Sequence, residues 1–566
     1  MRADDRKLDG LRAQHTEAEN HYIDELVAGR LDRRAFLRRG AVIGMSASAM
    51  GAILAACGGA NSTGNSGGGT SSSTSTAAGT PKHGGTLNVA VQTPATAMNP
   101  MVVNDGGGLC MLGVPGEFLT FDDNLKLQLY PMLASSYAHN GDGSVWTFTL
   151  RQNVKFHDGT PLTADDVVYT FQQLADPKNS SNALSTFVGV LKPDGVRSKD
   201  THTVEFHLEA PNGNFPYFVS NDNYNAIIVP KGTDFAKWGK TMVGTGPFKL
   251  KSYQTNQGAE FVANPGYWGQ KPYLDALSFK FYESQQPQIV ALQGGIVDCI
   301  GQLVPSGAQS VLNGSKYTII KTKSSNHREM SMRCDQAPFT DARVRQAIAL
   351  SIDRRAMVQA LLQGLGNLGN DNPFAPMFKS ADLSAPQRAQ DIAKAKQLLQ
   401  AAGHTHFTAT MAADIYEEIP QLAQVFQQSA AKIGVTIHLK VENQTAYYGK
   451  AVFGNSDWLD SEMSLVNYGD RGVPNVFLNA PLTTHGSWNA AHFHNAAYDK
   501  LYQQYVAAID LQTQKQIAGK IERLLLNETP LVIPYWIDGL TATTPKVHGV
   551  NPTGLSQLFL GKTYMD

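Results

Sequence analysis

Residues 146–167 read WTFTLRQNVKFHDGTPLTADDV, and they carry three local signals in a short space. Apolar and polar side chains alternate over 146–150, which predicts a half-buried strand. We expect the strand to continue into 151–159 and to end there in a turn. Thr163 suits a helix N-cap, and the two aspartates that follow it suit a first helical turn. The stretch therefore predicts strand, turn and helix in succession, as in an α/β protein.

Similar patterns recur along the chain. Residues 85–91 (GTLNVAV) alternate as a first strand, and 338–348 (PFTDARVRQAI) open a helix expected to run to about Leu362. Residues 398–403 (LLQAAG) predict a helix that ends at a glycine, and 435–441 (VTIHLKV) alternate as a strand. The chain is thus expected to mix helices and strands from beginning to end.

Five blocks of the sequence, two of which (146–167 and 338–348) are quoted above, resemble in their order the extracellular solute-binding proteins of ABC importers, family 5, the peptide/nickel group. The resemblance covers about residues 82–560. The blocks that carry it are 146–167, 244–250 (GTGPFKL), 264–275 (NPGYWGQKPYLD), 338–348 and 522–534 (ERLLLNETPLVIP).

The resemblance implies an α/β fold of the two-lobed periplasmic-binding-protein kind, type II, cluster C. Lobe one would comprise 81–326 and 530–566, with an extra subdomain at about 128–240. Lobe two would comprise 327–529. The lobes would close on a ligand by a hinge motion.

Composition excludes several classes of protein. The 566 residues allow roughly three domains, and 42% hydrophobic with 17% charged residues is typical of globular chains. The 47 Lys and Arg nearly balance the 48 Asp and Glu. We therefore expect no nucleic-acid partner, because backbone binding needs a basic surplus. The chain has no strongly apolar run of about 18 residues, so it is not polytopic in a membrane.

The first 80 residues predict an export signal and a lipid anchor. Residues 32–38 (DRRAFLR) have the form of a twin-arginine export signal, with Arg33 and Arg34 as the pair. An uncharged, mildly apolar segment then leads to LAAC, which resembles the bacterial lipobox and makes Cys57 the site of lipid attachment. The signal peptide would be 1–56. Residues 57–80 would form a lipidated tether, because 58–80 contain only Gly, Ala, Asn, Ser and Thr.

The stretch 457–478 is the most informative about a ligand. Peptide-binding relatives carry a Trp and an Asp here, and the Asp pairs with the α-ammonium of the ligand. In our alignment Leu465 stands at the Trp position and Asn467 at the Asp position, which removes the charge. Asp470 substitutes for it if the register shifts. Loss of the counter-ion of a buried ammonium costs about 3–5 kcal/mol, so the alignment disfavours free-amine peptides.

Arg333 is the second polar candidate. The resemblance places it near the hinge, facing the cleft, where it could bind a carboxylate or phosphate in bidentate fashion; a structural salt bridge is the alternative. With Asn467 it favours an acidic ligand without an obligatory ammonium, such as an opine, a modified peptide or a sugar acid. Aromatic side chains would bind its flat or apolar parts. The complete set of ligand-binding candidates is Asn104, Tyr224, Arg333, Trp458, Asn467, Tyr468, Asp470 and Trp488.

We expect no catalytic residues, metal site or cofactor. The pair His157-Asp158 lacks a nucleophile at a recognisable spacing, so a strand-to-turn hydrogen bond is the preferred interpretation. Residues 404–406 and 492–494 each hold two histidines, and two unrelated loops are preferred over a nickel site. Residues 106–108 (GGG) lack the Lys-Ser/Thr of a phosphate loop and are interpreted as a flexible turn. Cys110, Cys299 and Cys334 allow at most one disulfide.

These observations predict a lipid-anchored, extracytoplasmic receptor of an ABC importer, on the cell surface or in the periplasm. Its partners would be a small organic solute and the permease subunits in the membrane, and the receptor itself would be a monomer. Two alternatives remain open. One is a binding protein for sensing or envelope chaperoning without transport, and the other is a secreted hydrolase on the same scaffold.

Overall fold

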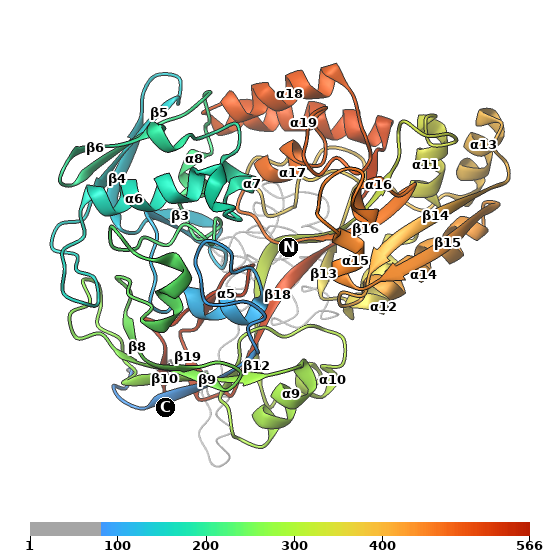
Figure 1. The fold of residues 1–566 in the computed structure, drawn as a ribbon. Helices are drawn as coiled ribbons and strands as arrows, with labels where there is room; N and C mark the ends of the chain where they lie inside the picture. The colour runs from blue at the N-terminus through green and yellow to red at the C-terminus, as the bar shows by residue number, and fades with distance from the viewer. Residues whose placement is uncertain (1–80) are drawn as a thin grey trace, which may run out of the picture. The chain divides into compact units, whose positions relative to one another are not determined.

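A computed structural model describes residues 81–566 (Figure 1). The buried apolar side chains of these residues form several clusters. The predicted signal at 1–56 with Arg33 and Arg34, and the predicted tether at 57–80 with Cys57, lie outside the described residues. Within 81–566, no helix is long and apolar enough to cross a membrane.

A 12-stranded sheet runs through the described chain, with β12 (Thr318–Met332) and β18 (Tyr535–Thr543) next to each other at its centre. β1 (Thr86–Gln92) pairs in parallel with β10 (Ala276–Tyr282) and β11 (Cys299–Ile300). β14 (Phe407–Asp414) pairs in parallel with β15 (Val435–Glu442) and β16 (Met463–Tyr468). On one side of the central pair the strands follow in the order β16 (Met463–Tyr468), β14 (Phe407–Asp414) and β15 (Val435–Glu442). On the other side they are β11 (Cys299–Ile300), β1 (Thr86–Gln92), β10 (Ala276–Tyr282), β9 (Gly258–Ala263) and β8 (Phe248–Gln254). The short strands β13 (Gly366–Leu368) and β17 (Leu531–Val532) pair with β18 and β12.

The first lobe surrounds β1 and β8 to β11. It holds α5 (Gly106–Leu112) and α9 (Gln285–Gln293), and a separate sheet with the strand order β4-β5-β7-β6. That sheet and helix α6 (Ala164–Ala175), which packs on it, lie within the expected extra subdomain at 128–240. The strands of the separate sheet are β4 (Ala134–His139), β5 (Val145–Leu150), β6 (Val196–Asp200) and β7 (Thr203–His207).

The stretch 146–167 folds largely as predicted. β5 alternates in burial, and Asp166 caps α6 by accepting hydrogen bonds from the amide and hydroxyl of Thr163 at 2.8 and 2.9 Å. The predicted extension of the strand through 151–159 is wrong. These residues form turns, in which Lys155 makes one isolated bridge to Pro161.

The second lobe packs helices around β14, β15 and β16. The single helix predicted to run to Leu362 is two helices, because α11 ends at Ser351 and Asp353 starts α12 by accepting a hydrogen bond from the amide of Ala356 at 3.0 Å. Gly403 ends α13 in the left-handed conformation, as predicted. The helices of this lobe are α11 (Ala342–Ser351), α12 (Arg354–Leu362), α13 (Ile392–Ala402), α14 (Ile419–Ala431), α15 (Gln444–Tyr448), α16 (Asp457–Asp460), α17 (Asn475–Asn479), α18 (Ala496–Ala507) and α19 (Leu511–Glu528).

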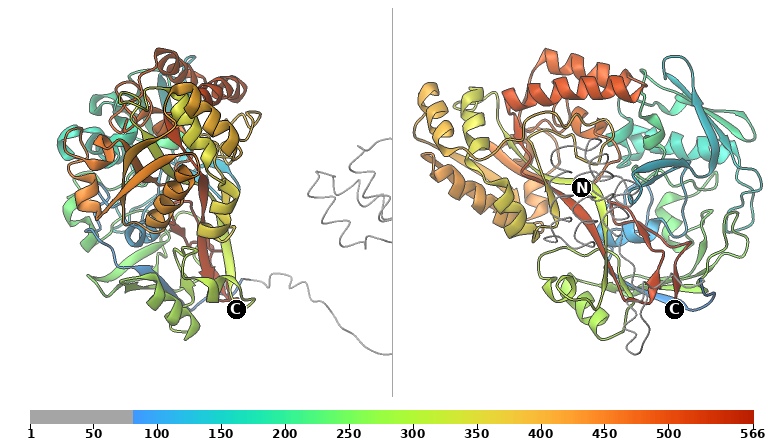
Figure 2. Two further views of the ribbon diagram at one scale, coloured as in Figure 1. Left: turned by 90° about the vertical axis from the view of Figure 1, so that its right-hand side faces the viewer. Right: turned by 180° about the vertical axis from the view of Figure 1, so that it is seen from behind.

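β12 and β18 lie side by side and connect the two lobes (Figure 2). β12 first pairs with β18, shifts register between Thr322 and Asn326, and from His327 onward also pairs with β16. The expected lobe boundary at 326/327 falls in this crossing. The expected return at 530 is too early, because the side chains up to Ile537 still pack in the second lobe. Leu540 is the first to pack in the other.

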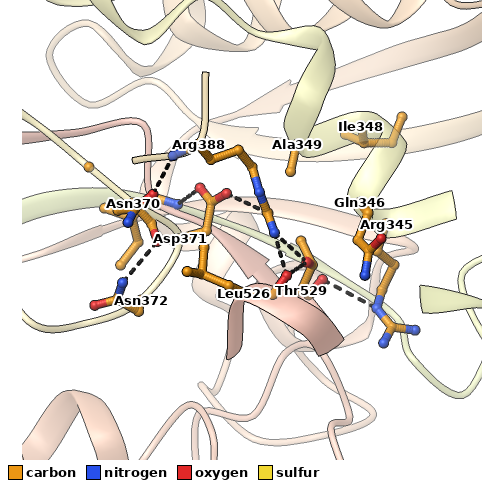
Figure 3. A network of polar contacts seen from close by, with 12 residues as sticks. Arg345, Gln346, Ile348, Ala349, Asn370, Asp371, Asn372, Arg388, Leu526 and Thr529 are labelled. Atoms are coloured by element: carbon orange, nitrogen blue, oxygen red, sulfur yellow. Dashed lines mark hydrogen bonds and ion pairs between the residues drawn. The ribbon is translucent and has the colours of Figure 1, made fainter. Parts of the chain in front are cut away.

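A buried ionic network ties the second lobe to the returning strand (Figure 3). Asp371 is fully buried and accepts hydrogen bonds from Arg354 and Arg388, each at 2.7 Å. Its Oδ1 also accepts from the amide of Ile533 at 3.2 Å. Arg388 further donates to the hydroxyl of Thr529 at 3.2 Å. Because both arginines share this carboxylate, the network fixes the chain just before it crosses back.

Candidate functional site

The two lobes touch beyond the crossing strands. The amide of Gly213 donates to the carbonyl of Val506 at 2.9 Å, and the side-chain amide of Asn214 donates to Asn475 at 2.8 Å. The described conformation is therefore one in which the first and second lobes face each other in contact.

A cavity of about 1000 Å³ lies between the lobes. The first lobe lines it with residues near the end of β1 and the start of α5, and with glutamines of α9. The second lobe lines it with the end of β14, the loop after it, α15 and β16. Ligands of α/β sheets bind outside the carboxyl ends of the strands, and this cavity lies at the carboxyl ends of β1 and β14. Its polar lining includes Asn104, Asp105, Gln302, Asp414, Glu417 and Asn467.

An aromatic pocket of about 330 Å³ adjoins this cavity and shares Asn104, Tyr448 and Asn467 with it. Its rings pack on one another, with centroids 5.9 Å apart for Tyr468 and Trp488 and 6.1 Å apart for Trp458 and Trp488. The indole N–H of Trp458 and the hydroxyl of Tyr468 are buried without a hydrogen-bond partner anywhere in 81–566. Two unpaired polar groups in an aromatic pocket are suited to the polar groups of a ligand.

The structure brings six of the eight predicted site residues to this aromatic pocket. Tyr224 comes from the first lobe and contacts Arg471 of the second, whose guanidinium lies 5.8 Å from the ring centroid. The six are Asn104, Tyr224, Trp458, Asn467, Tyr468 and Trp488.

Arg333 does not face the cleft, contrary to the sequence-based expectation. Its guanidinium makes a bidentate pair with Asp335, with both hydrogen bonds at 2.8 Å, and also donates to the carbonyl of Asp460. It lies one residue beyond the end of β12, five residues from the position that faces Asn467. The structural salt bridge, weighed as the alternative, is what the structure shows, so Arg333 gives no support for an acidic ligand.

Arg328 lies opposite Asn467 on the neighbouring strand and was missed in the sequence. Its guanidinium is fully buried and donates to Asn467, to Glu417 at 2.7 Å and to Glu418 at 2.9 Å. Tyr535 donates to the other oxygen of Glu418 at 2.9 Å. Arg328 therefore holds Asn467 in place behind the cavity, and two carboxylates already balance its charge.

Asp470 lies outside both cavities and is fully buried at the crossing of the lobes. Its Oδ1 accepts hydrogen bonds from the amide of Ser325 at 2.6 Å and from the hydroxyls of Ser324 and Ser325. Two aspartates of the first lobe, Asp122 and Asp222, lie near it. The charge of Asp470 raises the pKa of both, and the charge of Asp122 also raises the pKa of Asp222. Asp470 thus belongs to a buried acidic cluster at the lobe interface.

We expect this acidic cluster to make stability fall as pH rises. Burial, and then neighbouring carboxylates, raise the pKa of Asp122 to about 7 and that of Asp222 well above its usual range. The folded state therefore binds more protons, and its stability is greatest below the unfolded pKa of about 4 and is lost as pH rises through the folded values. Asp222→Asn should make the free energy of unfolding fall less steeply with pH, by at most about 1.4 kcal/mol per pH unit.

Thermal or urea unfolding at pH 5, 6, 7 and 8 measures this slope. The exposed Asp165→Asn serves as the control and should keep the wild-type slope. An unchanged slope in Asp222→Asn would show that these aspartates do not take up protons on folding.

The other chemical candidates have structural roles. The ring of His157 bonds to the carbonyl of Gly246 at 3.0 Å, while Asp158 accepts from the amide and hydroxyl of Thr160, which agrees with the preferred interpretation. Residues 106–108 open α5 instead of forming a flexible turn, and a Cβ at Gly107 would lie 1.9 Å from the carbonyl oxygen of Gln92. These glycines therefore serve close packing.

No disulfide or metal cluster is found in 81–566. Cys110, Cys299 and Cys334 are free, and burial raises the pKa of Cys110 to about 12. The described histidines, cysteines and carboxylates form no group of three or more with the geometry of a metal site.

A further cavity, of about 640 Å³, lies wholly within the first lobe. At its wall, Glu117 accepts hydrogen bonds from Thr245, Tyr267 and Trp268, and burial raises its pKa to about 7. A ligand there would contact one lobe only and could not favour the closed form over the open one. The cavity between the lobes is therefore the candidate site.

Residues 128–488 match the profile of the bacterial extracellular solute-binding proteins, family 5 Middle. The protein belongs to this family. Heme-binding protein A of Haemophilus influenzae is 27% identical over 74% of this chain and 81% of its own length. The periplasmic murein peptide-binding protein MppA of Escherichia coli is 27% identical over 75% and 84%. The structure of the ABC transporter substrate-binding protein CtaP of Listeria monocytogenes superposes with a TM-score of 0.75, at 23% identity, over 86% of this chain and all of that one.

As a family 5 solute-binding protein, the chain is a receptor for a solute and not an enzyme. Its two-lobed type II α/β fold is that of the family. Several residues at its site were missed in the sequence, among them Arg328, Asp414 and Tyr448. Only Asp414 had a readable signal, because it ends a strand pattern in an α/β lobe, where ligands bind.

Proposed function

We propose that this family 5 protein is the lipid-anchored receptor of an ABC importer. It captures a small organic solute in the cavity between its lobes and delivers it to permease subunits in the membrane. The observation that carries the proposal is a cavity lined from both lobes that continues into an aromatic pocket with two unpaired buried donors. The lipid on Cys57 and the twin-arginine export rest on the sequence of the first 57 residues.

The two-sided lining supports a closing mechanism. A solute held by both lobes contacts more of the protein in the closed form, so it binds that form more tightly. A change from mostly open to mostly closed needs about 5.5 kcal/mol of differential affinity. The crossing at 322–326, where β12 shifts register against β18, is the hinge that we propose.

The relatives include a heme-binding and a murein peptide-binding protein. We take from them that the scaffold admits chemically different solutes. The lining of the cavity, and not the fold, must therefore select the solute of this protein. For this chain the lining predicts a solute with a flat or apolar part for the aromatic pocket and polar groups for the larger cavity.

A thermal-shift screen of the purified protein tests the receptor function. The panel contains di- to pentapeptides, opines, sugars, sugar acids and arylalkylamines. A solute present at about 100 times its dissociation constant should stabilise the protein by about 2.7 kcal/mol. Trp488→Ala should weaken binding of the solutes found by about 2 kcal/mol, because it removes one wall of the aromatic pocket.

The control is Phe453→Ala, which removes an exposed aromatic ring from the same lobe. It should leave the affinity unchanged. Solutes that bind Trp488→Ala as tightly as the wild type would place the binding site elsewhere.

A further inference from the structure

Asp414 is the last residue of β14 and lines the cavity between the lobes. Its side chain is fully buried. Oδ1 accepts a hydrogen bond from the amide of Tyr416 at 3.1 Å, whereas Oδ2 has no partner among the described residues. A buried carboxylate with a free oxygen is costly for the fold alone, so its position calls for a second group to pair with it.

The groups around Asp414 do not supply a cation. Burial raises the pKa of Asp414 above its ordinary value, and the charge of Arg328 offsets only part of this rise. The guanidinium of Arg328 is already engaged by Glu417 and Glu418, and it does not line the cavity. Gln444 and Tyr448, which lie near Asp414, are uncharged.

The rest of the cavity wall is also acidic. Asp105 and Glu417 line it with Asp414, and the part of its wall formed by described residues includes no Lys, Arg or His. The other polar groups on the wall are mainly side-chain amides, with the hydroxyls of Thr93, Tyr416 and Tyr448, and all of these can accept as well as donate hydrogen bonds. Of these three carboxylates only Glu417 is paired with a cation, Arg328. The wall is therefore negative overall, so it would repel an anionic solute and attract a cationic one.

We propose that Asp414 is the anchor for a positively charged group of the solute, and that this receptor takes solutes that bear an amine or a guanidinium. The proposal rests on the proposed receptor function. Tyr448 borders both the larger cavity and the aromatic pocket, so a solute whose cation meets Asp414 can extend its flat part toward Trp458 and Trp488. This assignment replaces the acidic, amine-free solute expected from Asn467 and Arg333.

Matched probes test the charge directly by isothermal titration calorimetry. The cationic probes are tyramine, L-tyrosinamide, agmatine and spermidine. N-acetyltyramine and N-acetyl-L-tyrosinamide keep the ring without the charge, and 3-(4-hydroxyphenyl)propionate reverses it. We expect one or more cationic probes to bind, and the acetylated or anionic counterpart of a bound aromatic amine to bind at least about 100-fold more weakly.

Asp414→Asn should weaken binding of the cationic probes by about 100-fold or more, and it should leave the unliganded protein as stable as the wild type or more so. If the variant loses affinity but keeps the stability of the wild type, it has lost the anchor and is not misfolded. The control is Glu522→Gln, which replaces a buried carboxyl on α19 away from the cavity by an amide, and it should not change the affinity.

The outcomes separate this inference from the receptor function. Binding of neutral or anionic solutes at the cavity, with equal affinity in Asp414→Asn, would overturn the inference and leave the receptor function intact. Absence of binding by all cationic probes, while other members of the thermal-shift panel bind, would also overturn it. If no member of either panel binds the folded protein, the receptor function itself is contradicted.

Discussion

Replacing Arg328 by methionine should lower the free energy of unfolding by about 3–5 kcal/mol. The guanidinium is fully buried and pairs with Glu417 and Glu418, while it also donates to Asn467. Methionine fills part of the volume but leaves the buried Glu418 and the partly exposed Glu417 without a counter-charge. Because Asn467 lies on the wall of both cavities, the variant should also bind solute more weakly.

Urea unfolding of the full chain measures the loss of stability, followed by the titration described above. A double variant, Arg328→Met with Glu418→Gln, provides the control. It removes one of the stranded charges and should recover part of the lost stability. A loss of less than about 1 kcal/mol in the single variant, as for an exposed pair, would show that Arg328 does not compensate buried charge.

Asp371→Ala should be destabilising to a similar degree, by about 3–5 kcal/mol. The carboxylate is the shared partner of Arg354 and Arg388, and it also accepts from the amide of Ile533. Its removal leaves two guanidinium groups next to each other, and Arg354 remains almost wholly buried. The effect should fall on the second lobe and on the strand that returns from it (Figure 3).

Chemical denaturation measures this change as well, and Asp391→Ala is the matched control. Asp391 caps α13 and accepts a single hydrogen bond from the amide of Lys394, so its loss should cost only about 1 kcal/mol. Equal effects of the two substitutions would contradict a special role for the buried network.

Local sequence patterns predicted the elements that depend on nearby residues. The strand at 146–150, the cap at Thr163 and the end of α13 at Gly403 follow from periodicity and from side chains within a few positions. Not all of the predictions that were wrong depend on the tertiary structure. Asp353 could have been recognised as a cap, but the packing that turns 106–108 into a helix involves Gln92, which lies outside any local window.

The residues of the candidate site also divide into those that the local sequence indicated and those that depend on the tertiary structure. Aromatic residues in 457–488 indicated the aromatic pocket, because such side chains gather where ligands bind and are easy to recognise in a sequence. The partners of the charged side chains were not predicted correctly. Arg333 finds its partner two residues away, at Asp335, whereas Arg328 finds partners some 90 residues away, at Glu417 and Glu418. The partners of Arg328, and the lack of one for Asp414, cannot be read from spacing, since they depend on how β12, β14 and β16 meet.

The most direct test of the whole account is a calorimetric titration of the protein with the cationic probes, carried out in parallel on the wild type and on Asp414→Asn. We expect one binding site per chain in the wild type and a loss of affinity of about 100-fold or more in the variant. Equal binding to both proteins, or binding of the uncharged and anionic probes alone, would contradict it.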